Sequence, residues 1–83
     1  MYVVITYDAD IEERKNIRSV VKGQLHWIQY STYAGELTRT ATEDLFINLK
    51  KSVKKARISF WIFDRPPEVR QIGSQKDKES IFL

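Results

Sequence analysis

The amino-acid sequence predicts a small α+β domain in which two helices cover one face of an antiparallel sheet. Its 83 residues are enough for one domain. Two stretches with helical spacing of apolar residues alternate with stretches rich in aromatic and β-branched residues, which are typical of strands. The order strand, helix, one or two strands, helix, strand indicates that both halves of the chain contribute to one shared sheet.

The first strand is expected over residues 1–7, MYVVITY. Its apolar side chains occupy both faces, with Val3, Ile5 and Tyr7 on one side and Tyr2 and Val4 on the other. A strand that is apolar on both faces belongs in the middle of a sheet. Asp8 ends this apolar run.

A helix is expected to follow. Asp10, with Glu13 three residues later, fits a helix N-cap, and both carboxylates suit the positive end of the helix dipole. Gly23 is expected to close the helix. The residues that form its apolar stripe are Ile17, Val20, Val21 and Leu25.

The rest of the chain is expected to alternate in the same way. Residues 27–37, WIQYSTYAGEL, are extended, either as one bulged strand or as two short strands, with a bulge or turn at Ala34-Gly35. A capping box over residues 40–43, TATE, opens a second helix, and strands are expected over residues 57–63 and, in short form, within residues 68–73. The apolar face of the second helix holds Leu45, Phe46, Leu49, Val53 and Ala56.

These elements predict a ferredoxin-like βαββαβ sandwich over residues 1–73, followed by a C-terminal tail over residues 74–83. The face without helices would need another cover, and a second copy of the chain is the simplest one. Residues 81–83, IFL, are expected to pair with that partner as an exchanged strand. The aromatic side chains expected on the uncovered face are Tyr30, Tyr33, Trp61 and Phe63.

Composition narrows the chemistry. The chain has no cysteine and a single histidine, His26, so disulfides and thiolate sites are excluded and a histidine zinc site is disfavoured. A metal would therefore be a hard cation bound through oxygen. The net charge of +3 is compatible with a nucleic-acid partner. No apolar run approaches the roughly 20 residues of a membrane helix, and no signal peptide is recognisable, so we expect a cytoplasmic protein without membrane contact.

Asp8 is the candidate functional carboxylate. It follows the central strand, and strand ends are where α/β sheets usually present ligands. Asp8 and Asp10 could bind a magnesium or manganese ion, but Asp10 also fits a helix cap and Asp8 could serve a turn or cap. One chain offers few ligands, whereas a two-fold axis would bring two copies of Asp8 together.

Basic side chains form two clusters, each of which has two interpretations. Either cluster could be a solvated helix face, and cations also suit the negative end of the second helix. Alternatively, they contact nucleic-acid phosphates in a salt-sensitive manner. Base stacking on the strands is the weaker alternative, because core or dimer packing explains the aromatic residues. The first cluster is Arg14, Lys15 and Arg18, and the second is Lys50, Lys51, Lys54, Lys55 and Arg57.

A resemblance to a known family spans essentially the whole chain. MYVVITYDAD, the basic helix, WIQYSTYAGELT and RISFWIF together resemble the small CRISPR-associated protein of the spacer-acquisition machinery, first described as a metal-dependent endoribonuclease. The closing IGSQKDKESIFL resembles the tail that this family donates to the other subunit. The virulence-associated D family of toxin-like ribonucleases shares the fold and is an alternative. The matching blocks are Tyr7-Asp8 at the strand end and Gln29, Ser31, Tyr33, Gly35 and Leu37.

The resemblance implies a metal-dependent phosphodiesterase. The family is a homodimer in which the strand-end aspartates face each other, so Asp8 would be both the catalytic and the metal-binding residue, with Mg²⁺ or Mn²⁺ as the cofactor. The substrate would be a phosphodiester in RNA or DNA. The matching blocks place Tyr7, Ser31 and Tyr33 near that site.

The resemblance also implies protein and nucleic-acid partners. The family bridges dimers of the CRISPR integrase subunit on duplex DNA, and single-stranded RNA is a further candidate ligand. Arg14, Lys15 and Arg18 stand where family members carry basic residues, so they are expected to contact nucleic acid. The residues alone do not decide between a nuclease and a non-catalytic adaptor, because both contain Asp8.

Overall fold

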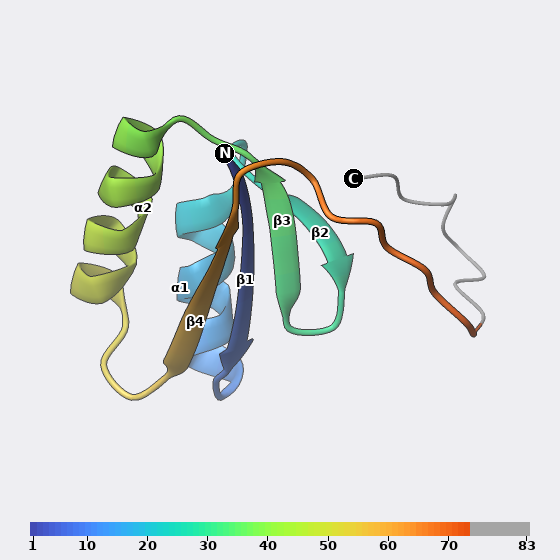
Figure 1. Ribbon diagram of the computed structural model, residues 1–83. Coiled ribbons are helices and arrows are strands. Elements are labelled where there is room, and N and C mark those ends of the chain that lie inside the picture. Colours follow the sequence, from blue (N-terminus) through green and yellow to red (C-terminus); the bar gives the residue numbers. More distant parts are fainter. Residues whose placement is uncertain (74–83) are drawn as a thin grey trace.

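The computed structural model describes residues 1–73 as a four-stranded antiparallel sheet with two helices. The predicted tail over residues 74–83, with the exchanged strand that it was expected to form, lies outside the described residues. Figure 1 shows both helices on the same face of the sheet, which confirms the predicted ferredoxin-like α+β plan. The elements are β1 (Tyr2–Asp8), α1 (Ile11–Val21), β2 (His26–Gln29), β3 (Thr32–Glu36), α2 (Arg39–Ser52) and β4 (Arg57–Phe63).

The sheet has the strand order β2-β3-β1-β4, so β1 is an inner strand, as its two apolar faces predicted. All three pairings are antiparallel. In the longest one, the seven residues of β1 pair with the seven of β4, from Tyr2 opposite Phe63 to Asp8 opposite Arg57. The register of β4 therefore fixes which basic side chain lies beside the candidate carboxylate.

The structure decides between the two alternatives for residues 27–37 in favour of a hairpin of two short strands. Ser31 adopts a φ of 63° in the turn between β2 and β3. The predicted bulge or turn at Ala34-Gly35 is wrong, because both residues pair with β1 inside β3. A Cβ atom at Gly35 would come within 3.2 Å of Leu25 Cδ2, so the glycine allows the chain before β2 to approach closely. The irregularity in pairing lies instead between Trp27 and Gln29.

The ends of α1 follow the sequence prediction, and the start of α2 does not. Asp10 caps α1 by accepting a hydrogen bond from the Glu13 backbone N–H at 2.9 Å, and Gly23 follows the helix with a φ of 83°. The capping box predicted over residues 40–43 is wrong. Thr38 caps α2 instead, because its hydroxyl accepts from the Ala41 N–H at 3.0 Å and residues 40–43 already lie inside the helix.

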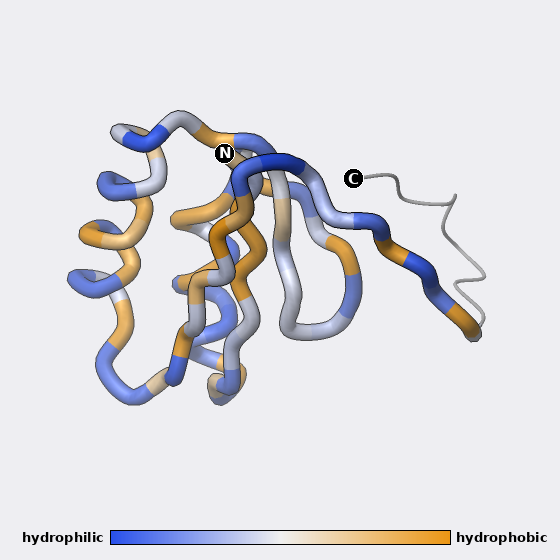
Figure 2. Tube along the Cα trace, in the orientation of Figure 1, coloured by the Kyte–Doolittle hydropathy of each residue, from blue (hydrophilic) through white to orange (hydrophobic). Residues whose placement is uncertain are grey.

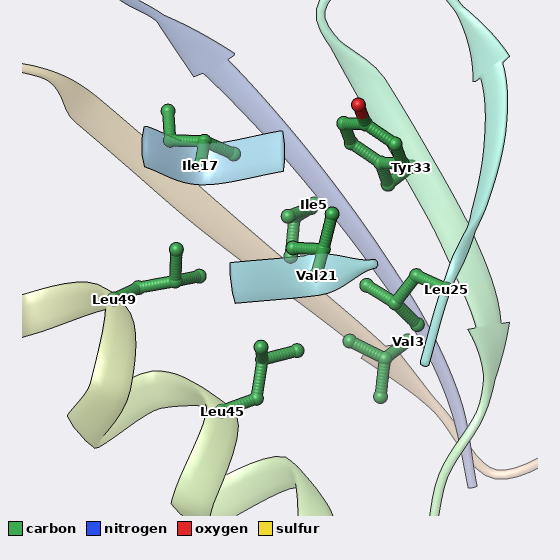
Figure 3. Packing of buried hydrophobic residues seen from close by; sticks show 8 residues of the cluster. All are labelled: Val3, Ile5, Ile17, Val21, Leu25, Tyr33, Leu45 and Leu49. Carbon is green, nitrogen blue, oxygen red and sulfur yellow. The ribbon is translucent and has the colours of Figure 1, made fainter. Parts of the chain in front are cut away.

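The main core lies between the sheet and the two helices. Figure 3 shows Val3 and Ile5 of β1 beside Leu45 and Leu49 of α2, with Ile17 and Val21 of α1 above the sheet. Val53 and Ala56 lie beyond the end of α2 and pack against this core from the following loop. A smaller cluster on the opposite face contains Tyr2, Ile28 and Ala34, with Val4 against it.

The aromatic residues divide between the two faces differently from the prediction. Tyr33 belongs to the core beneath the helices, because it pairs with Ile5 and therefore shares its face. Tyr30 precedes Ser31 in the hairpin turn and is exposed. Trp61 and Phe63 do lie on the face without helices, opposite Val4 and Tyr2 in the pairing with β1.

The chain after β4 crosses the face without helices. Figures 1 and 2 show this mostly hydrophilic segment passing the ends of β3 and β2. No strand forms over residues 68–73, so that prediction is wrong for the described chain. The segment nevertheless touches the sheet, because the Gln71 side chain donates a hydrogen bond to Gln29 at 3.3 Å. No helix among residues 1–73 is long and apolar enough to cross a membrane.

Candidate nucleic-acid interface

Asp8 lies at the exposed end of β1, on the face that no helix covers. Its pairing partner in β4 is Arg57, and both residues line a shallow hollow of about 210 Å³ together with Thr6, Tyr7 and Ser59. The N-cap position of α1 is taken by Asp10, so Asp8 has no capping role there. Among residues 1–73, no side chain donates a hydrogen bond to the Asp8 carboxylate. The carboxylate is therefore available to a ligand.

A single chain does not supply a complete metal site. Within the described part of the chain, no three aspartate, glutamate or histidine side chains lie together in a way that could hold an ion. Asp8 alone fits a hard cation through its carboxylate oxygens, and Asp10 is engaged by the helix terminus. The remaining ligands of any cation would have to come from a second chain, from water or from a phosphate.

The other predicted site residues gather in a second hollow, which we call the aromatic hollow. It measures about 460 Å³ and lies between α1 and the β2–β3 turn. It unites Arg14 and Arg18 of the predicted basic cluster, whereas Lys15 is exposed and does not line it. The residues that line the aromatic hollow are Tyr7, Arg14, Arg18, Trp27, Tyr30, Ser31 and Tyr33.

The two hollows lie on opposite sides of β1. Tyr7 and Asp8 are consecutive in a strand, so their side chains point to opposite faces. The Tyr7 ring lies against the Tyr33 ring, with their centroids 6.1 Å apart and nearly parallel. The Tyr7 backbone N–H donates to the Ser31 carbonyl at 3.1 Å, which ties the hairpin turn to the end of β1. The predicted site residues are thus close in space, but they form two adjoining surfaces.

Arginine side chains dominate the electrostatics of the aromatic hollow. Arg14 Nη1 donates to the Tyr30 hydroxyl at 3.0 Å, and its guanidinium carbon lies 5.6 Å from the Tyr30 ring centroid. Burial raises the pKa of the Tyr7 hydroxyl, while Arg14 and Arg18 partly offset this by favouring its anionic form. Both arginines therefore act on the same small volume.

Sequence reasoning missed the role of Glu13. Its side chain does not complete a capping box but accepts hydrogen bonds from the backbone N–H groups of Lys54 and Lys55, the latter at 3.0 Å. These bonds hold the loop before β4 against α1, and they lower the pKa of the Glu13 carboxyl below its ordinary value. The burial of a glutamate within a charged helix turn has no signal in the local sequence.

The pairing of Arg57 with Asp8 was also missed. The first strand was expected to end at Tyr7, whereas β1 extends to Asp8 and pairs its last residue with the first residue of β4. The basic cluster after α2 consequently reaches the same strand end as the candidate carboxylate.

These features define a ferredoxin-like domain with an exposed carboxylate at the end of its central strand and arginine side chains on both sides of that end. Comparison with known proteins gives the family. The family model described as CRISPR associated protein Cas2 matches residues 1–68, and the chain belongs to this family.

Individual relatives agree with this assignment. A protein of Methanothermobacter thermautotrophicus named CRISPR-associated endoribonuclease Cas2 is 30% identical over 87 residues, which cover 100% of this chain and 96% of the relative. A protein of the same name from Fusobacterium nucleatum is 34% identical over 92 residues, covering 100% and 87%. A solved structure titled "Crystal structure of cas2" superposes with a TM-score of 0.85 at 27% identity, covering 100% of this chain and 98% of the other.

Proposed function

We propose that this chain is a dimeric, metal-dependent phosphodiesterase that cleaves RNA or DNA in CRISPR adaptation, with Asp8 as its catalytic and metal-binding residue. The observation that supports this most directly is the position of Asp8, an exposed carboxylate without a hydrogen-bond donor among residues 1–73, at the end of the central strand. The name endoribonuclease, carried by the related Cas2 proteins of Methanothermobacter and Fusobacterium, agrees with this chemistry.

The dimer is supported by the face without helices. Trp61 and Phe63 are 53% and 38% exposed there, which is a large apolar area for a small domain. The Tyr2 hydroxyl is buried on the same face and has no hydrogen-bond partner among residues 1–73, so a group of a second chain could satisfy it. A second copy that covers this face, with residues 81–83 exchanged between subunits, would bring the two Asp8 side chains together.

A divalent cation between the two Asp8 carboxylates would remove their mutual repulsion. Bound Mg²⁺ or Mn²⁺ would polarise a phosphoryl oxygen and lower the pKa of a water. Arg57 of the same chain lies beside Asp8, where its guanidinium could contact a non-bridging oxygen of the phosphate that is cleaved. This arrangement needs two chains, which agrees with the single carboxylate available in each.

The basic side chains support a nucleic-acid partner. Lys15 and Arg18 are exposed on α1, and Arg14 lies beside them at the aromatic hollow. We propose that these residues contact phosphates of duplex DNA or single-stranded RNA, and that the dimer bridges dimers of the CRISPR integrase subunit. A non-catalytic adaptor is the second candidate function, favoured by the observation that one described chain offers only one free carboxylate at the site.

The experiment compares single substitutions of two aspartates that lie two positions apart in the sequence. Asp8→Asn removes the charge of the proposed metal ligand, and Asp10→Asn removes a charge nearby while keeping a side chain that caps helices well. We expect metal-dependent cleavage of RNA or DNA by the parent and by Asp10→Asn, and none by Asp8→Asn. Equal cleavage by both variants would show that Asp8 is not the catalytic residue. Binding without cleavage by every variant, with stable integrase association, would establish the adaptor.

A further inference from the structure

We propose that the aromatic hollow holds one unpaired nucleotide of a single-stranded nucleic acid, with its base against the Tyr30 ring and its phosphate on Arg14 and Arg18. The proposal rests on the proposed function for the class of ligand, a nucleic acid. It adds a site for a base, which phosphate contacts along a helix would not provide.

The size and lining of the aromatic hollow suit a nucleotide. Its volume of about 460 Å³ falls within the roughly 300–1,000 Å³ of small-ligand sites. Four of the seven lining residues are aromatic, and one of these, Tyr30, is 70% exposed. An exposed ring of this kind can stack on a base, while the Tyr33 ring beside it is buried.

The charge of the aromatic hollow suits a phosphate. Among the described residues that line it, Arg14 and Arg18 are cationic and none is acidic. The bond from Arg14 to the Tyr30 hydroxyl fixes one edge of the guanidinium. Arg14 Nε is shielded from solvent and has no acceptor among residues 1–73. The free protein therefore contains an arginine that is oriented but incompletely bonded, and a small shift of its side chain would let an oxygen of a bound ligand satisfy this donor.

A hollow of this kind distinguishes single strands from duplexes. The bases of a duplex are paired and stacked on each other, so their faces are not accessible to protein rings. An unpaired base can leave the strand and stack on Tyr30. Tyr7 lines both the aromatic hollow and the hollow of Asp8. The bound nucleotide would therefore lie close to Asp8, but the bond that is cleaved would belong to a neighbouring nucleotide.

The experiment uses Trp27 as a reporter in a chain that cannot cleave. The chain has two tryptophans, so Trp61→Phe leaves Trp27 as the single tryptophan, and Asp8→Asn is expected to prevent cleavage. Three probes are titrated: a short single-stranded RNA, the DNA of the same sequence, and an abasic DNA strand with the same number of phosphates. We expect the strands with bases to quench Trp27 and to bind at least about 5-fold more tightly than the abasic strand, the least effect of stacking one base.

Three variants separate the base from the phosphates. Tyr30→Ala should abolish the preference for strands with bases, whereas Tyr30→Phe should keep it because the ring remains. Lys15→Ala, on the same helix but outside the aromatic hollow, should weaken binding of all strands equally. Tyr30 is in an exposed turn, and circular dichroism checks that each variant folds.

The outcomes separate a failure of the nucleotide site from a failure of the proposed function. Equal affinity for abasic strands and strands with bases, or a base preference that survives Tyr30→Ala, would overturn the nucleotide site and leave the nuclease proposal standing. If a duplex quenches the Trp27 fluorescence as strongly as the single strand does, the nucleotide site is also overturned. If no strand binds at all, the nucleotide site and the proposed function both fail.

Discussion

Replacing Asp10 with alanine tests whether the two neighbouring aspartates have different roles. Asp10 Oδ1 accepts a hydrogen bond from the Glu13 N–H at 2.9 Å, and Asp10→Ala removes this acceptor from the first turn of α1. Loss of such a cap costs about 0.5–2 kcal/mol. Because the bond is only partly buried, water can replace part of it, which places the expected loss near ~1 kcal/mol.

That loss converts into a measurable shift. For a domain of this size, ~1 kcal/mol lowers Tm by about 4–8 °C. Thermal unfolding followed by circular dichroism, at one fixed protein concentration, gives the comparison, because the Tm of a dimer depends on concentration. Asp8→Ala is the matched control and should not lower Tm, since no described residue donates a hydrogen bond to the Asp8 carboxylate. Equal losses for both variants, or a larger loss for Asp8→Ala, would refute the division of roles.

Three further predictions concern stability, association and binding. Glu13→Gln should lower Tm at neutral pH, because a neutral amide oxygen accepts the loop N–H bonds more weakly than a carboxylate and the amide NH2 group cannot accept them at all. The lowered pKa of the Glu13 carboxyl stabilises the fold above about pH 4.5, and this stabilisation is lost on acidification, so the Tm of the variant should fall less than that of the parent at low pH. Trp61→Ala should raise the dissociation constant of the dimer at least about 10-fold, as expected when a tryptophan at an interface is lost, and sedimentation measures this constant. Ile62→Ala should leave the dissociation constant unchanged, because Ile62 is similarly exposed but lies on the opposite face of the sheet. Arg18→Ala should weaken DNA binding equally for unrelated sequences and reduce the log–log salt slope by about 0.9, and an unchanged slope in filter binding would contradict a phosphate contact.

The sequence predicted those parts of the fold that depend on local chemistry. The apolar residues on both faces of β1, the cap at Asp10 and the glycine after α1 are local patterns, and each has the predicted role. The start of α2 was wrong because Thr38 and Thr40 are both good caps, and the choice between them depends on where the chain leaves β3. Gly35 was taken for a turn because sequence does not show that Leu25 packs against it.

The candidate site was predicted as a set of residues but not as an arrangement. Asp8 and Tyr7 were expected near one site, and both line the hollow of Asp8, but Tyr7 also lines the aromatic hollow on the other side of the strand. Tyr33 was expected on the face without helices, and only the register with β1 places it under the helices. The contact of Glu13 with the loop at Lys54 joins residues 41 positions apart, and no local pattern encodes such a contact.

In the proposed dimer, a divalent cation binds between the two Asp8 carboxylates. Electron paramagnetic resonance of Mn²⁺ measures the number of bound ions directly, with the parent and Asp8→Asn at the same dimer concentration. We expect one tightly bound Mn²⁺ for every two parent chains and none for Asp8→Asn. One ion for every chain, or an Asp8→Asn dimer that binds Mn²⁺ as tightly as the parent, would contradict it.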